Sequence, residues 1–506
     1  MNLPPMGRYT MHRIAGLLFL IIIVGAHAQE GSASLTERSQ ASARGVLDRA
    51  VNALGGSAAL QAIRAVRYHY EGQSWERLQM PTPSPPYEAD TQQQTVLLDL
   101  ANDRLRVDQR ASAPGYEIYS SVVLKQGSGT NYNHRTRTAS PTSAGQQYAV
   151  YYRRVPQLLL REALSSANTL RYLGRDEVAG KSQDVITFVT SRTEQISLYV
   201  DVATGLISKC ELIYLDPLAG QAAAEFVFSN YTRSGQHMVP SVWTDSEADE
   251  PTGRYQARVE IDPQTSDAAF VVPHEGYTLA AATPPLKEEV EQLADGVVVM
   301  RNIAGPNQHS MVVAFVDHVV VFEAPGTSPG ADKLITRIKE SMPGKPIRYI
   351  VISHHHGDHI GGLRSFIAEG ATVITTPGNR AHIEALARAP QFDRLLAQPR
   401  KVEFLLIDKR RHVLRDASRT LELFDIGPNP HAREMVIAYL PKQRLLFQAD
   451  VFNMPYTPRP LTPAQALTRA FAERVRELGL DVERIVGVHG PTAKVSDFSA
   501  LTGLEL

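Results

Sequence analysis

The sequence predicts an α+β protein with two domains, because two kinds of strand pattern follow one another along its 506 residues. Up to about Pro273, strand-like segments rich in β-branched and aromatic residues lie between Gly, Asp, Asn and Pro, which is typical of an antiparallel sheet. A charged junction with two prolines comes next. Beyond it, apolar strands alternate with helical stretches, which favours sheets covered by helices. The predicted units are residues 1–28 (a signal peptide), 29–275 (the antiparallel sheet domain), 276–292 (a linker) and 293–506 (the mixed domain).

The N-terminus has the pattern of a secretory signal peptide. Arg8 and Arg13 precede the apolar run 14–24, and the small-residue triplet 26–28 follows it, so the sequence predicts cleavage after Ala28. The apolar run has eleven residues, whereas a helix that crosses a bilayer needs about 20. We therefore expect a periplasmic or secreted protein with no stable membrane span after cleavage.

Charge and cysteine content narrow the choice of partners. Lys and Arg number 52 against 53 for Asp and Glu, so the chain offers no broad attraction to polyanions, and we expect no nucleic-acid partner. The single cysteine, Cys210, excludes an intramolecular disulfide and alternates with apolar neighbours, which predicts a small core residue. The sequence does not indicate an oligomeric state.

The sheet domain begins with helical periodicity around Gly55 and Gly56, which predicts two short helices. The Pro-rich stretch 80–94 predicts a surface loop or strand connection. This half resembles the curved half-barrel of lipoprotein carriers in "ALGGSAALQAIRAVRYHYEGQ", "LYVDVATGLISKCEL" and "FVVPHEGYT". The resemblance implies an antiparallel sheet wrapped round an apolar concavity, where an apolar ligand could bind. The predicted strands cover residues 65–73, 95–101, 117–126, 182–191, 196–215, 223–231 and 255–262.

Four histidines and one aspartate occupy five of the six positions 354–359, between an apolar strand and a stretch with helical periodicity. If the loop starts out extended, His354 and His356 share a face and His355 points away. Imidazoles and carboxylates are the ligands that zinc prefers when no thiolate is present. A cation also keeps crowded imidazoles neutral, whereas a solvated His-rich loop would need neither the apolar strand before it nor the two glycines after it. The cluster therefore predicts a metal site.

The order of residues in this cluster, H-x-H-x-D-H, resembles the signature of the metallo-β-lactamase superfamily. The resemblance implies three later ligands, and His431, Asp450 and His489 follow in that order beside short apolar strands. It covers about residues 293–506 and implies an αβ/βα sandwich with a two-metal centre at one edge of its sheets. In place of an aspartate that usually ends an early strand, this chain has Glu323, for which we expect support of the ligands or simple capping of the strand end.

The resemblance also implies a division of the ligands between two zinc ions, with iron or manganese left open. One ion would be held by His354, His356 and His431, and the other by Asp358, His359 and His489, with Asp450 bridging both. Asp358 and Asp450 are the candidate catalytic residues, which would orient the nucleophile and pass on its proton.

The function that the resemblance implies is that of an exported, zinc-dependent hydrolase. It would use a metal-bridging hydroxide to cleave an ester, lactone, amide (β-lactam-like) or phosphoester bond of a small-molecule substrate. One alternative is an iron-dependent oxidoreductase of the persulfide-oxidising type, although the di-iron branch commonly has a glutamate where this chain has His356. The other is an envelope protein that binds or carries a ligand in its N-terminal sheet.

Overall fold

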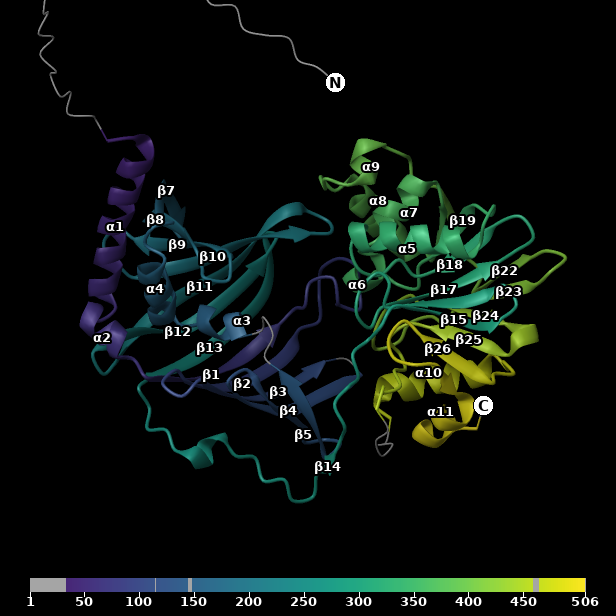
Figure 1. Cartoon of the computed structure of the whole chain (residues 1–506), viewed down its shortest axis with the longest axis horizontal. Helices are drawn as coiled ribbons and strands as arrows, with labels where there is room; N and C mark the ends of the chain where they lie inside the picture. Colours follow the sequence, from purple (N-terminus) through teal and green to yellow (C-terminus); the bar gives the residue numbers. More distant parts are fainter. Residues whose placement is uncertain (1–32, 114, 144–147, 458–463, 506) are drawn as a thin grey trace, which may run out of the picture.

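The computed structural model describes residues 33–113, 115–143, 148–457 and 464–505. The predicted signal peptide lies outside the described residues. Among the helices of the described part, none is long and apolar enough to cross a membrane. The chain forms two parts, which we call the N-terminal and C-terminal domains, and they lie side by side (Figure 1).

One large sheet dominates the N-terminal domain. In the described residues it has 14 strands and stays open between its edges, β14 and β7, so it is not a closed barrel. Neighbouring strands are antiparallel except for the edge pair β14 and β6. The strands are β1 (Ala65–Ser74), β2 (Asp90–Asp99), β3 (Arg104–Ala113), β4 (Tyr116–Lys125), β5 (Ser128–Asn133), β6 (Thr138–Ser143), β7 (Arg171–Val178), β8 (Lys181–Val189), β9 (Gln195–Asp201), β10 (Ile207–Asp216), β11 (Gly220–Ser234), β12 (His237–Glu247), β13 (Glu250–Ile261) and β14 (Thr278–Leu279). In the sheet their order is β14-β6-β5-β4-β3-β2-β1-β13-β12-β11-β10-β9-β8-β7.

Helices cover one face of this sheet. Helix α1 begins with a capping box between Ser34 and Glu37 and buries Val46, Leu47 and Ala50 at helical spacing. These side chains share a core with α4 and with alternate residues of the strands, such as Tyr68 of β1. The first helix is longer than the two short ones expected. The helices are α1 (Leu35–Ala53), α2 (Ser57–Ala62), α3 (Tyr148–Arg153), α4 (Pro156–Ser165) and the 3₁₀ turn η2 (Asp267–Phe270).

The C-terminal domain has two sheets whose strands lie in chain order. The described residues give the first sheet seven strands and the second sheet six. The first contains β15 (Glu289–Ala294), β16 (Val297–Arg301), β17 (His309–Ala314), β18 (Val319–Phe322), β19 (Ile347–Val351), β20 (Thr372–Thr375) and β21 (Phe404–Leu406). The second contains β22 (Arg411–Arg415), β23 (Thr420–Asp425), β24 (Val436–Leu440), β25 (Leu445–Gln448), β26 (Arg484–Gly487) and β27 (Ala493–Lys494).

The two sheets pack face to face, and helices cover their outer faces (Figure 1). Strand β16 shows the layering, because Val297 and Val299 face the second sheet while Val298 and Met300 face the helices. Burial on both faces explains why these strands read as continuous apolar runs. The predicted α+β class with an αβ/βα sandwich is confirmed. The covering elements are α5 (Ser328–Ser341), α6 (Gly357–Ile360), α7 (Leu363–Glu369), η3 (Pro377–Asn379), α8 (Arg380–Arg388) and α9 (Arg394–Ala397) on the first sheet's side, and η4 (Pro441–Gln443), α10 (Ala466–Glu477) and α11 (Val495–Thr502) on the second's.

Residues 80–89 form part of the connection between β1 and β2, so the expected strand connection is present, but not all of the stretch is a surface loop. Strand β2 already begins at Asp90, within the stretch predicted as a loop, and pairs along its length with β1. Met80, at the start of that stretch, is 2% exposed because the connection packs against the C-terminal domain. The exact domain boundaries stay predictions.

Candidate metal centre

The seven predicted ligands come from the loops that follow the strands of the C-terminal sandwich. Strand β19 continues through buried Ile352 and Ser353 into the histidine cluster, and the helical turn α6 then carries Asp358 and His359. Asp450 and His489 come soon after β25 and β26, which are parallel neighbours. Because parallel strands end at the same edge, these two residues lie close together. His431 lies in the loop between β23 and β24 and completes the set.

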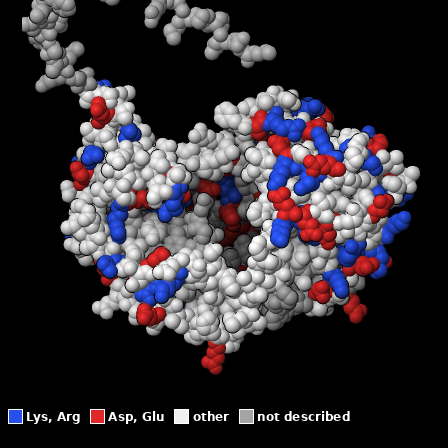
Figure 2. Space-filling model, viewed as in Figure 1, with Lys and Arg blue, Asp and Glu red and all other residues white. Residues whose placement is uncertain are grey.

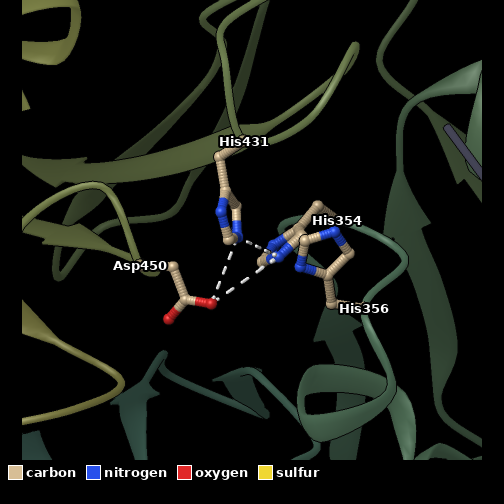
Figure 3. Close-up of side chains that lie close together, drawn as sticks. All are labelled: His354, His356, His431 and Asp450. Carbon is tan, nitrogen blue, oxygen red and sulfur yellow. Dashed lines mark hydrogen bonds and ion pairs between the residues drawn. The ribbon is translucent and has the colours of Figure 1, made fainter. Parts of the chain in front are cut away.

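The first group of side chains contains His354, His356, His431 and Asp450, whose candidate ligand atoms all lie within 4.8 Å of one another. The Nε2 atoms of His354 and His431 are 3.0 Å apart. Oδ2 of Asp450 lies 3.2 Å from Nε2 of His431 and 3.9 Å from Nε2 of His354. Figure 3 shows His354 and His356 beside one another, with His431 and Asp450 approaching them from two other segments of the chain.

The second group contains Asp358, His359, His489 and again Asp450, within the same 4.8 Å limit. Nε2 of His359 is 2.8 Å from Oδ2 of Asp450 and 3.4 Å from Oδ2 of Asp358. Nε2 of His489 is 3.2 Å from Oδ1 of Asp450 and 3.3 Å from Oδ2 of Asp358. Asp450 thus belongs to both groups, and the two groups are adjacent.

Acceptors outside the two groups hold the outer ring nitrogens of the histidines. Nδ1 of His489 donates to the carbonyl oxygen of Asn307 at 2.6 Å, and Nε2 of His356 donates to that of Met80 at 3.0 Å. A ring nitrogen that donates in this way leaves the other nitrogen of a neutral imidazole with a free lone pair. Among the described residues, Nδ1 of His356 is buried without a hydrogen bond. Such an orphaned acceptor fits a metal ligand.

Burial and charge act differently on the two groups. Burial, with the neighbouring imidazoles, holds the pKa of His354 and of His356 well below the usual range, so both rings are neutral, as ligation requires. Burial alone would also lower the pKa of His359, but the charges of Asp450 and Asp358 outweigh it and raise that pKa well above the usual range. For His489, contacts with the same two carboxylates likewise outweigh burial and raise the pKa to about 10.

These directions show that the carboxylates of the second group attract positive charge. Burial by itself would raise the pKa of Asp450, yet the charge of His359 and hydrogen bonds from three histidines hold that pKa well below its usual range. A divalent cation would supply positive charge next to these carboxylates and would accept the lone pairs of the neutral imidazoles. The donor set, all nitrogen and oxygen, therefore fits zinc or a similar ion.

Two acidic residues of the site lie at strand ends in a left-handed backbone conformation. Glu323 has φ 74° and Asp450 has φ 62°, a region that few residues other than glycine adopt. The Oε1 atom of Glu323 accepts from the backbone N–H of Ser353, and its Oε2 lies 3.3 Å from Nδ1 of His359. Glu323 thus both caps a strand and supports a candidate ligand, so both expected roles are present in one side chain.

Several contacts of the site have no motif in the sequence. Gln79 and Met80 reach the cluster from the N-terminal domain. Asn307 holds His489 through its carbonyl oxygen, and its side chain accepts from the hydroxyl of Tyr456. His355, expected not to be a ligand, belongs to neither group and donates to Met80 instead. Of these contacts, the sequence indicates only the one made by Asn307, through the turn-forming residues "GPNQ", and this indication is weak.

Comparison with known proteins finds a family match for the C-terminal domain. Residues 303–489, which include all seven candidate ligands, match the family model of the metallo-beta-lactamase superfamily. This part of the chain is a metallo-beta-lactamase superfamily domain. No curated protein sequence matches the chain.

Solved structures similar to the chain include metallo-beta-lactamases. One, from Pontibacter korlensis, is 17% identical, with 43% of this chain and all of that chain covered and a TM-score of 0.34. FIM-1 from Pseudomonas aeruginosa, in its mono-zinc form, is 18% identical, with 43% and 95% covered and a TM-score of 0.34. An enzyme from Hirschia baltica is 16% identical, with 42% and 95% covered and a TM-score of 0.32. Sequence identities and TM-scores this low indicate nothing about the substrate of this chain.

Proposed function

We propose that the protein is a zinc-dependent hydrolase with a two-metal centre. The superfamily to which its C-terminal domain belongs suggests a metal-dependent hydrolase in general. The observation that supports two ions is the sharing of Asp450 between two adjacent groups of nitrogen and oxygen donors. One ion would be held by His354, His356, His431 and Asp450, and the other by Asp358, His359, His489 and Asp450.

The residues of the centre have separate tasks in this proposal. Bound divalent ions supply an activated water nucleophile at neutral pH and polarise a carbonyl or phosphoryl oxygen. Asp358 and Asp450 would orient the water and pass on its proton, because an oxygen of each lies within 3.3 Å of Nε2 of His489 in the second group. Glu323 and Asn307 keep His359 and His489 turned inward through their outer ring nitrogens. Such fixed geometry lowers the reorganisation needed in the transition state.

The proposed substrate class is supported by this chemistry and is compatible with the shape of the surface. A water nucleophile beside Lewis acids cleaves esters, lactones, amides such as β-lactams, and phosphoesters. Figure 2 shows a hollow between the two halves of the molecule with charged side chains on its wall. A small-molecule substrate suits a site of this kind, and ligand sites commonly lie between domains. The proposal includes an exported location, and this part of it rests only on the signal-peptide pattern of residues 1–28.

A substrate panel tests the hydrolase. Purified protein would be assayed with chromogenic β-lactam, lactone, carboxylester and phosphodiester substrates, with metal content measured on the same samples. We expect zinc-dependent turnover of at least one class and its loss in His354→Ala and Asp450→Ala. Stoichiometric iron together with oxygen consumption on a persulfide would instead support the oxidoreductase. Absence of metal-dependent turnover in every class would count against hydrolysis.

A further inference from the structure

The connection between β1 and β2 leaves the N-terminal sheet and lies against the histidine cluster. The carbonyl oxygen of Leu78 accepts a hydrogen bond of 2.9 Å from the backbone N–H of Gly357, the residue that opens helix α6. A Cβ atom on Gly357 would lie 3.3 Å from the Leu78 side chain, so the two backbones approach closely here. The glycine in the H-x-H-x-D-H motif therefore leaves room for the N-terminal domain.

The next two residues of this connection contact candidate ligands. The carbonyl oxygen of Met80 accepts from Nε2 of His355 at 2.9 Å and from Nε2 of His356 at 3.0 Å. Because a carbonyl oxygen only accepts, it places the proton of neutral His356 on Nε2 and leaves Nδ1 free. The Nε2 amide group of Gln79 donates to Oδ1 of Asp358 at 2.8 Å. This bond leaves Oδ2 of Asp358 facing His359 and His489.

Both ends of the connection are fixed. Arg77, whose side chain is 6% exposed, pairs with Asp216 of the N-terminal sheet. On the other side, the carbonyl oxygen of Pro81 accepts from the backbone N–H of Arg433, two residues after His431, at 2.9 Å. Residues 78–80 are thus held between a buried ion pair of one domain and the ligand loops of the other, and their polar groups cannot turn away without breaking these contacts.

We infer that residues 78–80 of the N-terminal domain are positioning residues of the metal centre. The carbonyl of Met80 selects the tautomer of His356 for the first group, and the amide of Gln79 aims the carboxylate of Asp358 at the second. This inference rests on the proposed function, since it needs ions at the two groups. It assigns the N-terminal sheet a role in building the active site.

The variant Gln79→Met tests the inference, because methionine keeps the length of the side chain and removes the donor. Binding of cobalt(II) would be followed by visible absorption, and binding of zinc by competition with a chromophoric chelator. Loss of one outer contact typically weakens a metal site by about 10-fold to 100-fold. We expect one of the two binding steps to weaken by about 10-fold with a changed cobalt spectrum, and the other step to stay within about two-fold.

Two further variants complete the test. Gln93→Leu, at an exposed position on β2, should bind both ions as the wild type does. Gln79→Asn keeps an amide on a shorter side chain and should recover part of the lost affinity. Equal affinities and spectra for Gln79→Met and wild type would overturn the inference, as would an equal weakening of both steps. A wild-type protein that takes up two ions but hydrolyses nothing would refute only the hydrolase, whereas one that takes up none would refute both.

Discussion

Oδ2 of Asp450 lies 2.8 Å from Nε2 of His359, although the two residues follow strands of different sheets of the sandwich. Asp450 follows β25 of the second sheet, whereas His359 lies in α6, which follows β19 of the first. Their contact joins the two sheets at the edge where the candidate ligands gather. The centre therefore depends on the packing of the whole sandwich.

Substitution of Asp450 by asparagine should remove the bridge between the two groups. Asparagine has nearly the same shape but carries no charge and offers one oxygen, so binding of two adjacent dications is no longer supported. We expect the metal content to fall below two ions per chain and kcat/KM to fall by at least about 100-fold. Elemental analysis and steady-state kinetics would check this. Two retained ions with unchanged activity would contradict it.

Removal of metal should destabilise the protein. The carboxylates of Glu323, Asp358 and Asp450 meet in a buried site, and an ion that binds only the folded state stabilises it by mass action. At a free concentration of 100 times its Kd, an ion adds about 2.7 kcal/mol to the free energy of unfolding. We expect Tm to fall with a chelator and to recover with zinc. In His354→Ala the chelator should have a smaller effect, because the first group has lost a ligand while the second is intact, and an unchanged wild-type Tm would argue against bound metal.

Arg364 should be important for the stability of the C-terminal domain. Its guanidinium is 1% exposed, forms two bonds of 2.6 and 2.9 Å with Asp393, and donates to two backbone carbonyls at the end of α8. Arg364→Met leaves Asp393 buried without its partner, which costs about 3–5 kcal/mol. Urea unfolding would measure this loss in the free energy of unfolding. The control, Arg380→Met, removes an exposed pair with Glu384 and should cost about 0.3–0.5 kcal/mol.

Cys210 should be unreactive in the folded protein. Burial in the core of the N-terminal sheet raises the pKa of its thiol to about 12, so very little thiolate is present at pH 8. Ellman's reagent should react slowly with the native protein between pH 7 and 9 and quickly in denaturant, where the ordinary pKa of about 8.5 applies. Because the unfolded thiol ionises first, this group favours unfolding as the pH rises above about 8.5. Rapid labelling without denaturant would contradict the buried placement.

The sequence predicted the metal centre better than its surroundings. Residues 354–359 carry a dense local motif, and the resemblance of this motif to the superfamily signature implied the three later candidate ligands, which lie beside short apolar strands. Gln79 and Met80 carried no such signal, because they lie at the start of a Pro-rich stretch without periodicity. Their contacts span more than 270 positions and depend on how the two domains pack, which local patterns do not encode.

The N-terminal sheet was predicted as a class but not in detail. Strands such as β1 alternate between buried and exposed positions and were recognisable from that pattern. The beginning of β2 is polar on both faces, "DTQQQ", so it had the composition of a loop although it pairs with β1 throughout. Helix α4, which packs beside α1, was not expected because its ten residues are too few for a clear helical pattern.

The contact of Met80 with His356 also bears on the time at which the protein can capture its ions. During synthesis, residues 78–80 leave the ribosome long before His489 does. A partly synthesised chain therefore lacks some of the candidate ligands, and an ion that bound at this stage would have an incomplete set of donors. If the chain is translocated unfolded, metal binding must take place in the destination compartment, and the metal supply there would decide how much of the protein holds a complete centre.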